Sequence, residues 1–343
     1  MILLIIAVIM AGGIGERLWP LSTRKKPKQF HIFGAEKTLI ELTVERAQAF
    51  ADKIYIVTTR EQKALFTNYL PNFPQQNILI EPFRRNTAPA IALGCLHASD
   101  EDIIVVLPSD HIIRDKETFE RTMNSAIKEA SKNNILVTIG ITPNSPHTGY
   151  GYIERGETFN SETGSFTVKK FHEKPSFDVA QRYVKDGRFY WNSGMFVWKK
   201  SSFDKALASH LKDINSAMKE IKNDYSKLES VYKGMPNISV DYGIMEKADN
   251  VIVIPANFYW NDVGSWDSVY DLEEKDENGN VVKGNFILHN VRNSLLVNTT
   301  QRNIGISHVE DMIVVVSNEG TLLCHRGETQ YVREITKRLE EKA

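Results

Sequence analysis

The sequence predicts an α/β protein with a doubly wound, mostly parallel sheet, followed by a small β-rich unit. Two observations support this prediction. Short β-branched runs alternate with helical patterns through the first two-thirds of the chain, which is typical of β-α-β units. After Leu272 the composition changes to a charged stretch rich in Gly and Asn, and the segments beyond it are short and β-rich.

The first expected strand is the apolar run from Met1 to Met10, which has the composition of a fully buried strand. The other runs predict strands at 54–58, 78–80, 103–107, 135–141 and 251–254. A helix is expected over 115–132 with Asp115 as its N-cap, and apolar residues spaced by three and four predict a second helix over 201–224.

The charged stretch at 273–285 predicts a boundary between two domains, residues 1–272 and residues 285–343. Beyond the boundary, short β-rich pieces alternate with turn residues, and no long helical pattern begins before Thr336. The second unit is therefore predicted to be a small all-β domain, with a short β-helix and a roll both compatible with its pattern.

Composition excludes several classes of function. The chain has 343 residues with 42 basic and 43 acidic side chains, so no global field would recruit nucleic acid or an anionic membrane. The apolar start is too short to span a bilayer and has neither a basic region nor a cleavage site. Because Cys95 and Cys324 are far apart, we expect no disulfide framework and a cytoplasmic protein.

A glycine turn follows the first expected strand. Gly12, Gly13 and Gly15 would let backbone N–H groups approach an anion, and the start of a following helix would add its positive end. Arg17 and Lys28 supply cations close by, so the stretch predicts a phosphate site. If the glycines are considered alone, an ordinary connection from a strand to a loop is an equally good interpretation. No Gly-Lys-Ser/Thr closes the loop, and Leu18 replaces the third glycine of the dinucleotide motif.

Two acidic residues follow expected strands. Asp110 lies in Leu-Pro-Ser-Asp-His after strand 103–107, and Asp262 lies in a Trp-rich string after strand 251–254. Carboxylates at strand ends would form a clamp for Mg²⁺ held by nucleotide phosphates. A helix cap or an Asx-turn is the alternative for Asp110, and His111 is interpreted as a solvent-side or hydrogen-bonding residue rather than a base.

The first thirty residues resemble the signature of the sugar-1-phosphate nucleotidylyltransferases. The resemblance rests on one ordered string, Gly12-Gly13-x-Gly15-x-Arg17-Leu18-x-Pro20-Leu21-Ser22. Its continuation, Pro27-Lys28-Gln29-Phe30, resembles the mannose-1-phosphate guanylyltransferase branch. The resemblance implies a Rossmann-like catalytic domain and a tail that forms a left-handed β-helix fragment. It also implies a homodimer formed through that tail.

The resemblance also implies roles for single residues. Gly12, Gly13, Gly15 and Arg17 would hold the triphosphate, Lys28 would stabilise the transferring group, and Asp110 and Asp262 would hold Mg²⁺. The implied residues at the base end are Glu81, Asn86, Thr87 and Ser109. The implied residues at the sugar-phosphate end are Gly149, Glu173, Lys174, Asn192 and Asp241.

Several of these residues have a structural alternative. Glu173 and Lys174 could form a solvated ion pair, and the aromatic loops that carry Gly149 and Asn192 also occur as hairpin turns. Asp241 could be a helix N-cap, and so could Asn86 or Thr87.

The activity implied by the resemblance is transfer of a guanylyl group from GTP to mannose 1-phosphate, which gives GDP-mannose and pyrophosphate. No His-x-His cluster follows the boundary, so transferase activity alone is expected, without a fused isomerase. Three alternatives stay open: the same chemistry with glucose 1-phosphate and UTP or dTTP, a dinucleotide-dependent oxidoreductase, and a non-catalytic nucleotide-sugar sensor. A dinucleotide-dependent oxidoreductase would need an acidic residue at the end of its second strand to bind the ribose. The sequence there is Thr58-Thr59-Arg60-Glu61, which meets this requirement only weakly.

Overall fold

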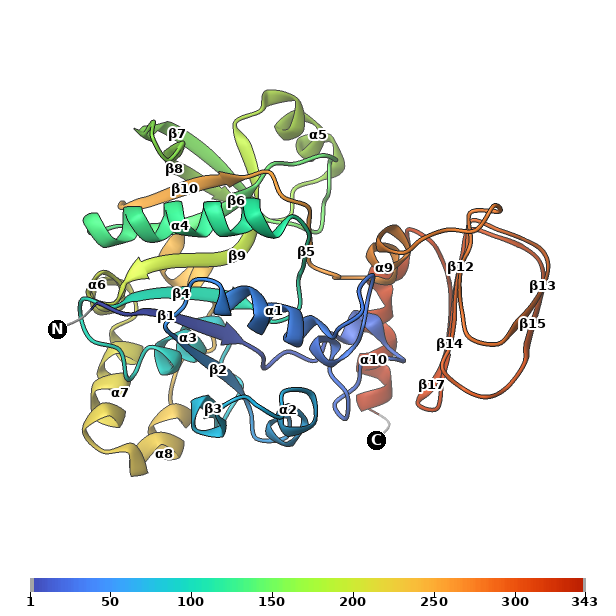
Figure 1. Ribbon diagram of the computed structural model, residues 1–343, viewed down its shortest axis with the longest axis horizontal. Coiled ribbons are helices and arrows are strands. Elements are labelled where there is room, and N and C mark those ends of the chain that lie inside the picture. The colour runs from blue at the N-terminus through green and yellow to red at the C-terminus, as the bar shows by residue number, and fades with distance from the viewer. Residues whose placement is uncertain (1–2, 342–343) are drawn as a thin grey trace.

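The computed structural model describes residues 3–341, so residues 1–2 and 342–343, the outer ends of the two predicted domains, lie outside the described residues. Within that range the largest sheet has nine strands (Figure 1). Their order is β3 (Ile78–Glu81), β2 (Lys53–Thr59), β1 (Ile5–Met10), β4 (Ile103–Pro108), β9 (Phe189–Lys199), β6 (Leu136–Ile141), β10 (Val251–Ala256), β8 (Ser165–His172) and β7 (Tyr152–Asn160).

The sheet is mixed rather than mostly parallel, which corrects the prediction. Strands β3, β2, β1 and β4 are parallel, as are β6 and β10, but β9 runs antiparallel between β4 and β6. The hairpin of β7 and β8 adds a further antiparallel edge. Strand β9 was not expected because its sequence, FYWNSGMFVWK, is rich in aromatic and small residues rather than β-branched ones.

The two faces of the sheet are covered by helices. In β1, Ala7 and Ile9 join one core cluster while Ile6 and Val8 join the other, as the alternation of side chains along a strand requires. One layer contains α1 (Leu39–Gln48), α2 (Lys63–Tyr69), α4 (Lys116–Lys132) and α5 (Phe177–Asp186). The other contains α3 (Thr87–Gly94), α6 (Lys200–His210), α7 (Lys212–Asn223) and α8 (Leu228–Lys233).

The two helices expected from the sequence have different outcomes. Helix α4 begins after Asp115, whose carboxylate accepts a hydrogen bond of 3.1 Å from the N–H of Thr118, so the predicted N-cap is confirmed. The helix expected over 201–224 is two helices, because Leu211 leaves the helical region with φ −134° and ψ 60°. Within residues 3–341, no helix combines the length and the apolar character that crossing a membrane demands.

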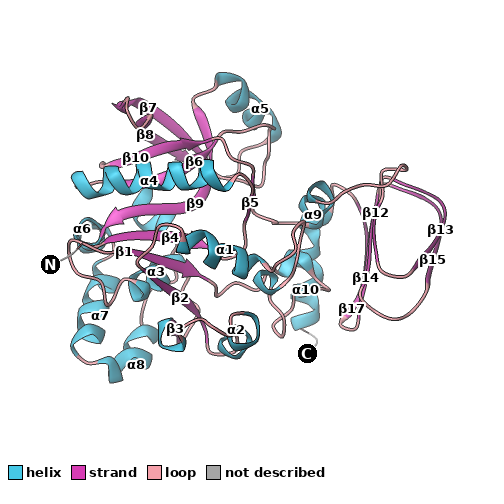
Figure 2. Cartoon of the chain, viewed as in Figure 1, coloured by secondary structure: helices cyan, strands magenta, loops and turns pink. Residues whose placement is uncertain are grey.

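Beyond the predicted boundary, short strands stack in parallel (Figure 2). Strands β12 (Val281–Lys283), β14 (Leu295–Asn298) and β16 (Met312–Ser317) pair in one sheet, which β17 (Gly320–His325) joins antiparallel. Strands β13 (Phe286–Arg292) and β15 (Ile304–Glu310) pair in a second sheet. Leu296 and Val314 lie in the apolar layer that the two sheets share.

The tail is not all-β, because it ends in helix α10 (Val332–Glu340). This helix returns to the first part of the chain and lies beside η1 (Glu16–Leu18), as Figure 1 shows. Val332 shares a buried cluster with Leu18 and with Trp266 of α9 (Trp266–Leu272). The stacked strands of the tail are therefore held to the glycine turn at the start of the chain.

Candidate active site

One cleft of about 950 Å³ contains every site residue predicted from the sequence. It opens where β1, β3 and β4 end, at the edge of the sheet where α/β proteins bind ligands. The predicted residues that line it are Gly12, Gly13, Gly15, Arg17, Lys28, Glu81, Asn86, Thr87, Ser109, Asp110, Gly149, Glu173, Lys174, Asn192, Asp241 and Asp262. Segments separated by more than two hundred residues thus meet in one place.

The glycine turn is held from behind by its own neighbours. The carbonyl of Ile14 accepts a hydrogen bond of 2.8 Å from the N–H of Lys28 and another from the Ser22 hydroxyl. Gly15 has φ +83°, and a Cβ there would lie 2.5 Å from the Cβ of Lys28, so this position requires glycine. Within residues 3–341, the N–H groups of Gly12 and Gly13 make no hydrogen bond and are free to bind an anion.

The segment after the turn differs from the prediction. Instead of an α-helix, three residues form the 3₁₀ turn η1, which begins directly after Gly15. A single turn supplies little helix dipole, since the macrodipole needs several aligned peptide units. The positive potential of this site therefore depends on its free N–H groups and on Arg17 and Lys28.

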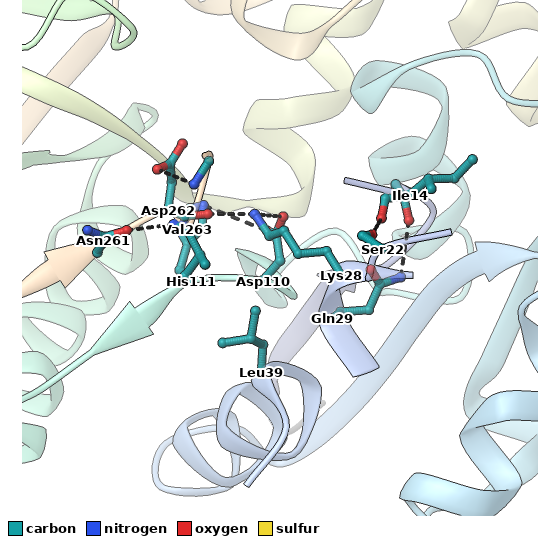
Figure 3. A network of polar contacts seen from close by, with 12 residues as sticks. Ile14, Ser22, Lys28, Gln29, Leu39, Asp110, His111, Asn261, Asp262 and Val263 are labelled. Carbon is teal, nitrogen blue, oxygen red and sulfur yellow. Dashed lines mark hydrogen bonds and ion pairs between the residues drawn. The ribbon is translucent and has the colours of Figure 1, made fainter. Parts of the chain in front are cut away.

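Lys28 lines the cleft and reaches between the two predicted acidic residues, as Figure 3 shows. Its ammonium is 2.5 Å from Oδ2 of Asp110 and donates a hydrogen bond of 2.5 Å to the main-chain carbonyl of Asp262. The side chain of Lys28 is 8% exposed, so its charge is screened little by solvent. Burial opposes ionisation of Asp110, yet Lys28 and His111 outweigh it and hold the pKa of this carboxyl below its usual value.

The carboxylate of Asp262 is oriented by two donors. Its Oδ1 accepts 3.0 Å hydrogen bonds from the Tyr150 hydroxyl and from the N–H of Gly264, while within residues 3–341 its Oδ2 accepts none. Val263 turns the chain here with φ +49°. Asp110 and Asp262 together offer hard oxygen atoms at the cleft wall, which is the donor type that Mg²⁺ prefers. In the part of the chain that the structure describes, no group of three or more His, Cys, Asp or Glu side chains could hold a metal, so these two carboxylates would need phosphate oxygens or water to complete a divalent-metal site.

His111 is buried beside Asp110 and is a structural residue of the site. The indole N–H of Trp260 donates a hydrogen bond of 3.1 Å to its Nδ1. Burial lowers the pKa of His111 to about 4, despite the opposing effect of Asp110, so the ring is neutral at pH 7. This agrees with its interpretation as a hydrogen-bonding residue rather than a base.

At the base end, Glu81 is a buried acid that Tyr232 contacts. Tyr232 donates a hydrogen bond of 3.2 Å to its Oε2, and burial raises the pKa of Glu81 to about 7. A Cβ at Gly12 would lie 2.6 Å from Oε1 of Glu81, so any larger residue at position 12 would clash with this oxygen.

Asn86 takes the N-cap role that the sequence left open between Asn86 and Thr87, and Thr87 is the first residue of α3. Oδ1 of Asn86 accepts a hydrogen bond of 2.9 Å from the N–H of Thr87 at the start of α3. The hydroxyl oxygen of Thr87 accepts one of 2.8 Å from the N–H of Val240. Both residues line the cleft, but these acceptor atoms already have protein partners. Asn86 could still offer a ligand its amide N–H₂ group.

At the sugar end, Asn192 and Asp241 form a pair. The amide of Asn192 donates a hydrogen bond of 2.7 Å to Oδ1 of Asp241, and burial raises the pKa of Asp241. Asn192 lies on β9 rather than in a hairpin turn. Asp241 is the first residue of the π-helical turn η5 (Asp241–Met245) and not its N-cap. Its carboxylate accepts the hydrogen bond from Asn192 rather than capping the turn.

Glu173 and Lys174 form the ion pair that the sequence offered as an alternative, at 3.4 Å. Their side chains are 45% and 55% exposed, and Lys174 has φ +36°. Gly149 lies on the facing loop, where its N–H donates a hydrogen bond of 3.1 Å to Nδ1 of His147. This part of the cleft is lined by groups that retain freedom to move.

The sequence reasoning missed four residues: Tyr150, Tyr232, Arg84 and Arg333. Tyr150 is adjacent to the predicted Gly149, and Arg84 lies between the predicted Glu81 and Asn86, so both had a local signal. Tyr232 lies 151 residues after Glu81 in the sequence, so no local signal linked the two residues. Arg333 lines the cleft from the far end of the chain, which no local motif indicated.

The fold and cleft define an α/β protein with a ligand-sized cleft at the edge of the sheet where its parallel strands end. The family model of the nucleotidyl transferases matches residues 6–279. The chain belongs to this family, and within it to the mannose-1-phosphate guanylyltransferases, as the recognition from sequence predicted.

Three comparisons support this membership. A mannose-1-phosphate guanylyltransferase of Salmonella montevideo is 37% identical over 98% of this chain and 74% of the relative. Mannose-1-phosphate guanylyltransferase 2 of Escherichia coli O157:H7 is 34% identical over 98% of this chain and 73% of the relative. A crystal structure described as mannose-1-phosphate geranyltransferase from Thermus thermophilus is 32% identical, with a TM-score of 0.86 over 97% of this chain and 98% of that one.

Proposed function

We propose that this nucleotidyltransferase makes GDP-mannose and pyrophosphate from GTP and mannose 1-phosphate. A phosphate oxygen of mannose 1-phosphate forms a bond to the α-phosphorus of GTP, and the bond from that phosphorus to the bridging oxygen breaks, so that pyrophosphate leaves. The nucleophile is already an anion, so no residue has to remove a proton from it. The task of the protein is then positioning and charge stabilisation.

The observation that carries the proposal is the position of Lys28. Its ammonium is buried and held by Asp110, in the same cleft that Gly12 and Gly13 line. A buried cation with fixed partners can stabilise charge that develops on the transferring group without first rearranging solvent. Gly12, Gly13, Gly15 and Arg17 are proposed to hold the triphosphate.

Asp110 and Asp262 are proposed to hold Mg²⁺. The ion would neutralise charge on the α-phosphate and help to orient it. Asp110 is suited to this role because its pKa is held below the usual value, which keeps the carboxylate ionised at neutral pH. Tyr150 fixes one oxygen of Asp262 and leaves the other available.

The two substrates are proposed to occupy opposite ends of the cleft. Guanine offers N1–H and an amino group as donors, and the Glu81 carboxylate can accept from both when it is ionised. Ser109 would contact the nucleotide close to Asp110. Mannose 1-phosphate would lie at the other end, with Lys174 on its phosphate. Gly149, Glu173, Asn192 and Asp241 would line its sugar pocket.

We further propose a division into residues 1–272 and 285–343, with a tail that winds as a left-handed β-helix fragment and pairs two chains into a homodimer. The parallel stacking of β12, β14 and β16 supports the helical winding. The exposed apolar side chains of Ile287 and Leu323 on the tail support a contact between chains. Free Cys95 and Cys324 suit a cytoplasmic protein, and the balanced charge suits small-molecule substrates rather than nucleic acid or membrane.

The test is pyrophosphate release with Mg²⁺, in which GTP, ATP, UTP and dTTP are each combined with mannose 1-phosphate and with glucose 1-phosphate. The proposal predicts a clear maximum for GTP with mannose 1-phosphate. A maximum for glucose 1-phosphate with UTP or dTTP would replace the substrates and keep the chemistry. No release with any pair would overturn the proposal in favour of a non-catalytic sensor.

A further inference from the structure

Helix α10 brings a cation of the tail into the nucleotide cleft. Arg333 lines the same cleft as Gly12, Arg17 and Lys28, although it lies more than fifty residues beyond the part of the chain that the family model matches. The guanidinium Nε of Arg333 is 3.4 Å from the Glu16 carboxylate, directly beside Arg17 in η1. Arg333 is therefore placed on the side of the cleft where the glycine turn holds phosphate.

The helix that carries Arg333 is fixed against this turn. Val332, its neighbour in sequence, is 2% exposed and shares a buried cluster with Leu18. The Ser317 hydroxyl donates a hydrogen bond of 3.1 Å to the carbonyl of Pro20, and Arg24 forms an ion pair of 2.7 Å with Glu340. The backbone of Arg333 is thus positioned by contacts on both sides of η1.

The side chain of Arg333, in contrast, is free to change partner. It is 55% exposed, and Glu16 is 40% exposed, so their contact is a solvated ion pair of little energy. A polyphosphate carries more charge than one carboxylate, and a guanidinium matches two phosphate oxygens with parallel N–H donors. A polyphosphate in the cleft would therefore compete well for this arginine.

We propose that Arg333 binds the β- and γ-phosphates of the nucleoside triphosphate, exchanging its contact with Glu16 for one with the phosphates. The inference rests on the proposed function, since it assigns a further contact to the same substrate. It gives the tail a direct part in the site, because the tail supplies a further cation beside Arg17. Pyrophosphate keeps this contact until it leaves.

The test is equilibrium binding of GTP and of GMP to the full chain in the presence of Mg²⁺. Arg333→Gln is expected to weaken GTP binding about tenfold, the effect of losing one charged hydrogen-bonding group, while GMP binding stays unchanged. Arg333→Lys keeps the charge and is expected to recover part of the affinity. Arg338→Gln is the matched control, because Arg338 is exposed on the same helix and does not line the cleft.

Glu16→Gln separates phosphate binding from a structural role. If Arg333 served only to hold η1 through Glu16, Glu16→Gln would weaken GTP binding as much as Arg333→Gln. The proposal predicts instead that Glu16→Gln leaves GTP binding unchanged or tightens it, because the arginine loses a competing partner. Equal loss in both variants, or a loss for GMP equal to that for GTP, would overturn the inference. If the unmutated chain bound no GTP, the proposed function itself would fail.

Discussion

The two ends of the cleft are built differently. At the catalytic end, Lys28 is 8% exposed and contacts both Asp110 and the carbonyl of Asp262 at 2.5 Å. At the sugar end, Glu173 and Lys174 are about half exposed and contact mainly each other, at 3.4 Å. The groups at the first end are buried and fixed by their partners, whereas those at the second are exposed and less constrained.

This difference follows from what each end must do. In the proposed reaction the catalytic end would stabilise charge that appears only during the reaction, and fixed dipoles and cations do this well because they need no reorganisation. The sugar end would admit and release a substrate, which is done by loops that open and close. The contrast predicts that substitutions at the first end reduce turnover, while those at the second raise KM for the sugar phosphate.

The largest effect is expected for Lys28→Ala. Removing the buried ammonium takes away charge stabilisation at the transferring group, so kcat should fall by about 10²- to 10³-fold. Asp110→Ala is expected to reduce turnover by a similar factor. The measurement is the steady-state rate of pyrophosphate release, with circular dichroism to show that the fold survives.

Lys25→Ala is the control for Lys28, since Lys25 is exposed and pairs with Glu319 at 3.3 Å on the surface. Its rate should equal that of the unmutated chain. Near-normal rates in both Lys28→Ala and Asp110→Ala would contradict a prearranged catalytic end.

Lys174→Ala should act on the substrate rather than on the chemical step. Losing one charged hydrogen bond to phosphate is expected to raise KM for mannose 1-phosphate by about ten- to a hundredfold and to leave KM for GTP unchanged. The two values come from initial rates with each substrate varied in turn. Lys170→Ala is a suitable control, because Lys170 is exposed on the neighbouring strand β8 and does not line the cleft. An equal rise in both KM values would break the proposed separation of the two ends.

The sequence predicted the cleft better than it predicted the sheet. Gly12, Lys28, Asp110 and Asp262 stand in short strings, so local patterns found them, and the strand order then brought them together. The direction of β9 depends on where a distant segment inserts, which no local pattern encodes. Tyr232 escaped for the same reason, because its contact with Glu81 exists only after α8 packs on the sheet.

The pH dependence of GTP binding should report on Glu81. Burial raises the pKa of Glu81 to about 7, so the carboxyl is protonated below this pH. Its O–H would then face the N1–H and amino donors of guanine and could not accept from both of them. Affinity for GTP should therefore rise by about tenfold from pH 6 to pH 8. In Glu81→Gln the affinity should be lower and nearly constant over this range. A slope that persists in the variant would show that another group titrates.

The smallest effect is expected for Tyr150→Phe, which links the two ends. The change removes the 3.0 Å hydrogen bond to Asp262 and keeps the ring, so kcat should fall about three- to tenfold. The Mg²⁺ concentration that gives half-maximal rate should rise as well, because one oxygen of Asp262 loses its orientation. Tyr259→Phe is the control, since Tyr259 is exposed and does not line the cleft. An unchanged Mg²⁺ dependence in Tyr150→Phe would refute this coupling.

The most direct test of the central claim follows the α-phosphorus. The chain is incubated with Mg²⁺, mannose 1-phosphate and GTP labelled at the α-phosphate, and the products are separated. Nucleotidyl transfer predicts that all transferred label appears in GDP-mannose, with one unlabelled pyrophosphate for each molecule formed. Label in free GMP, or release of single phosphate from the γ-position, would contradict attack on the α-phosphorus by the sugar phosphate.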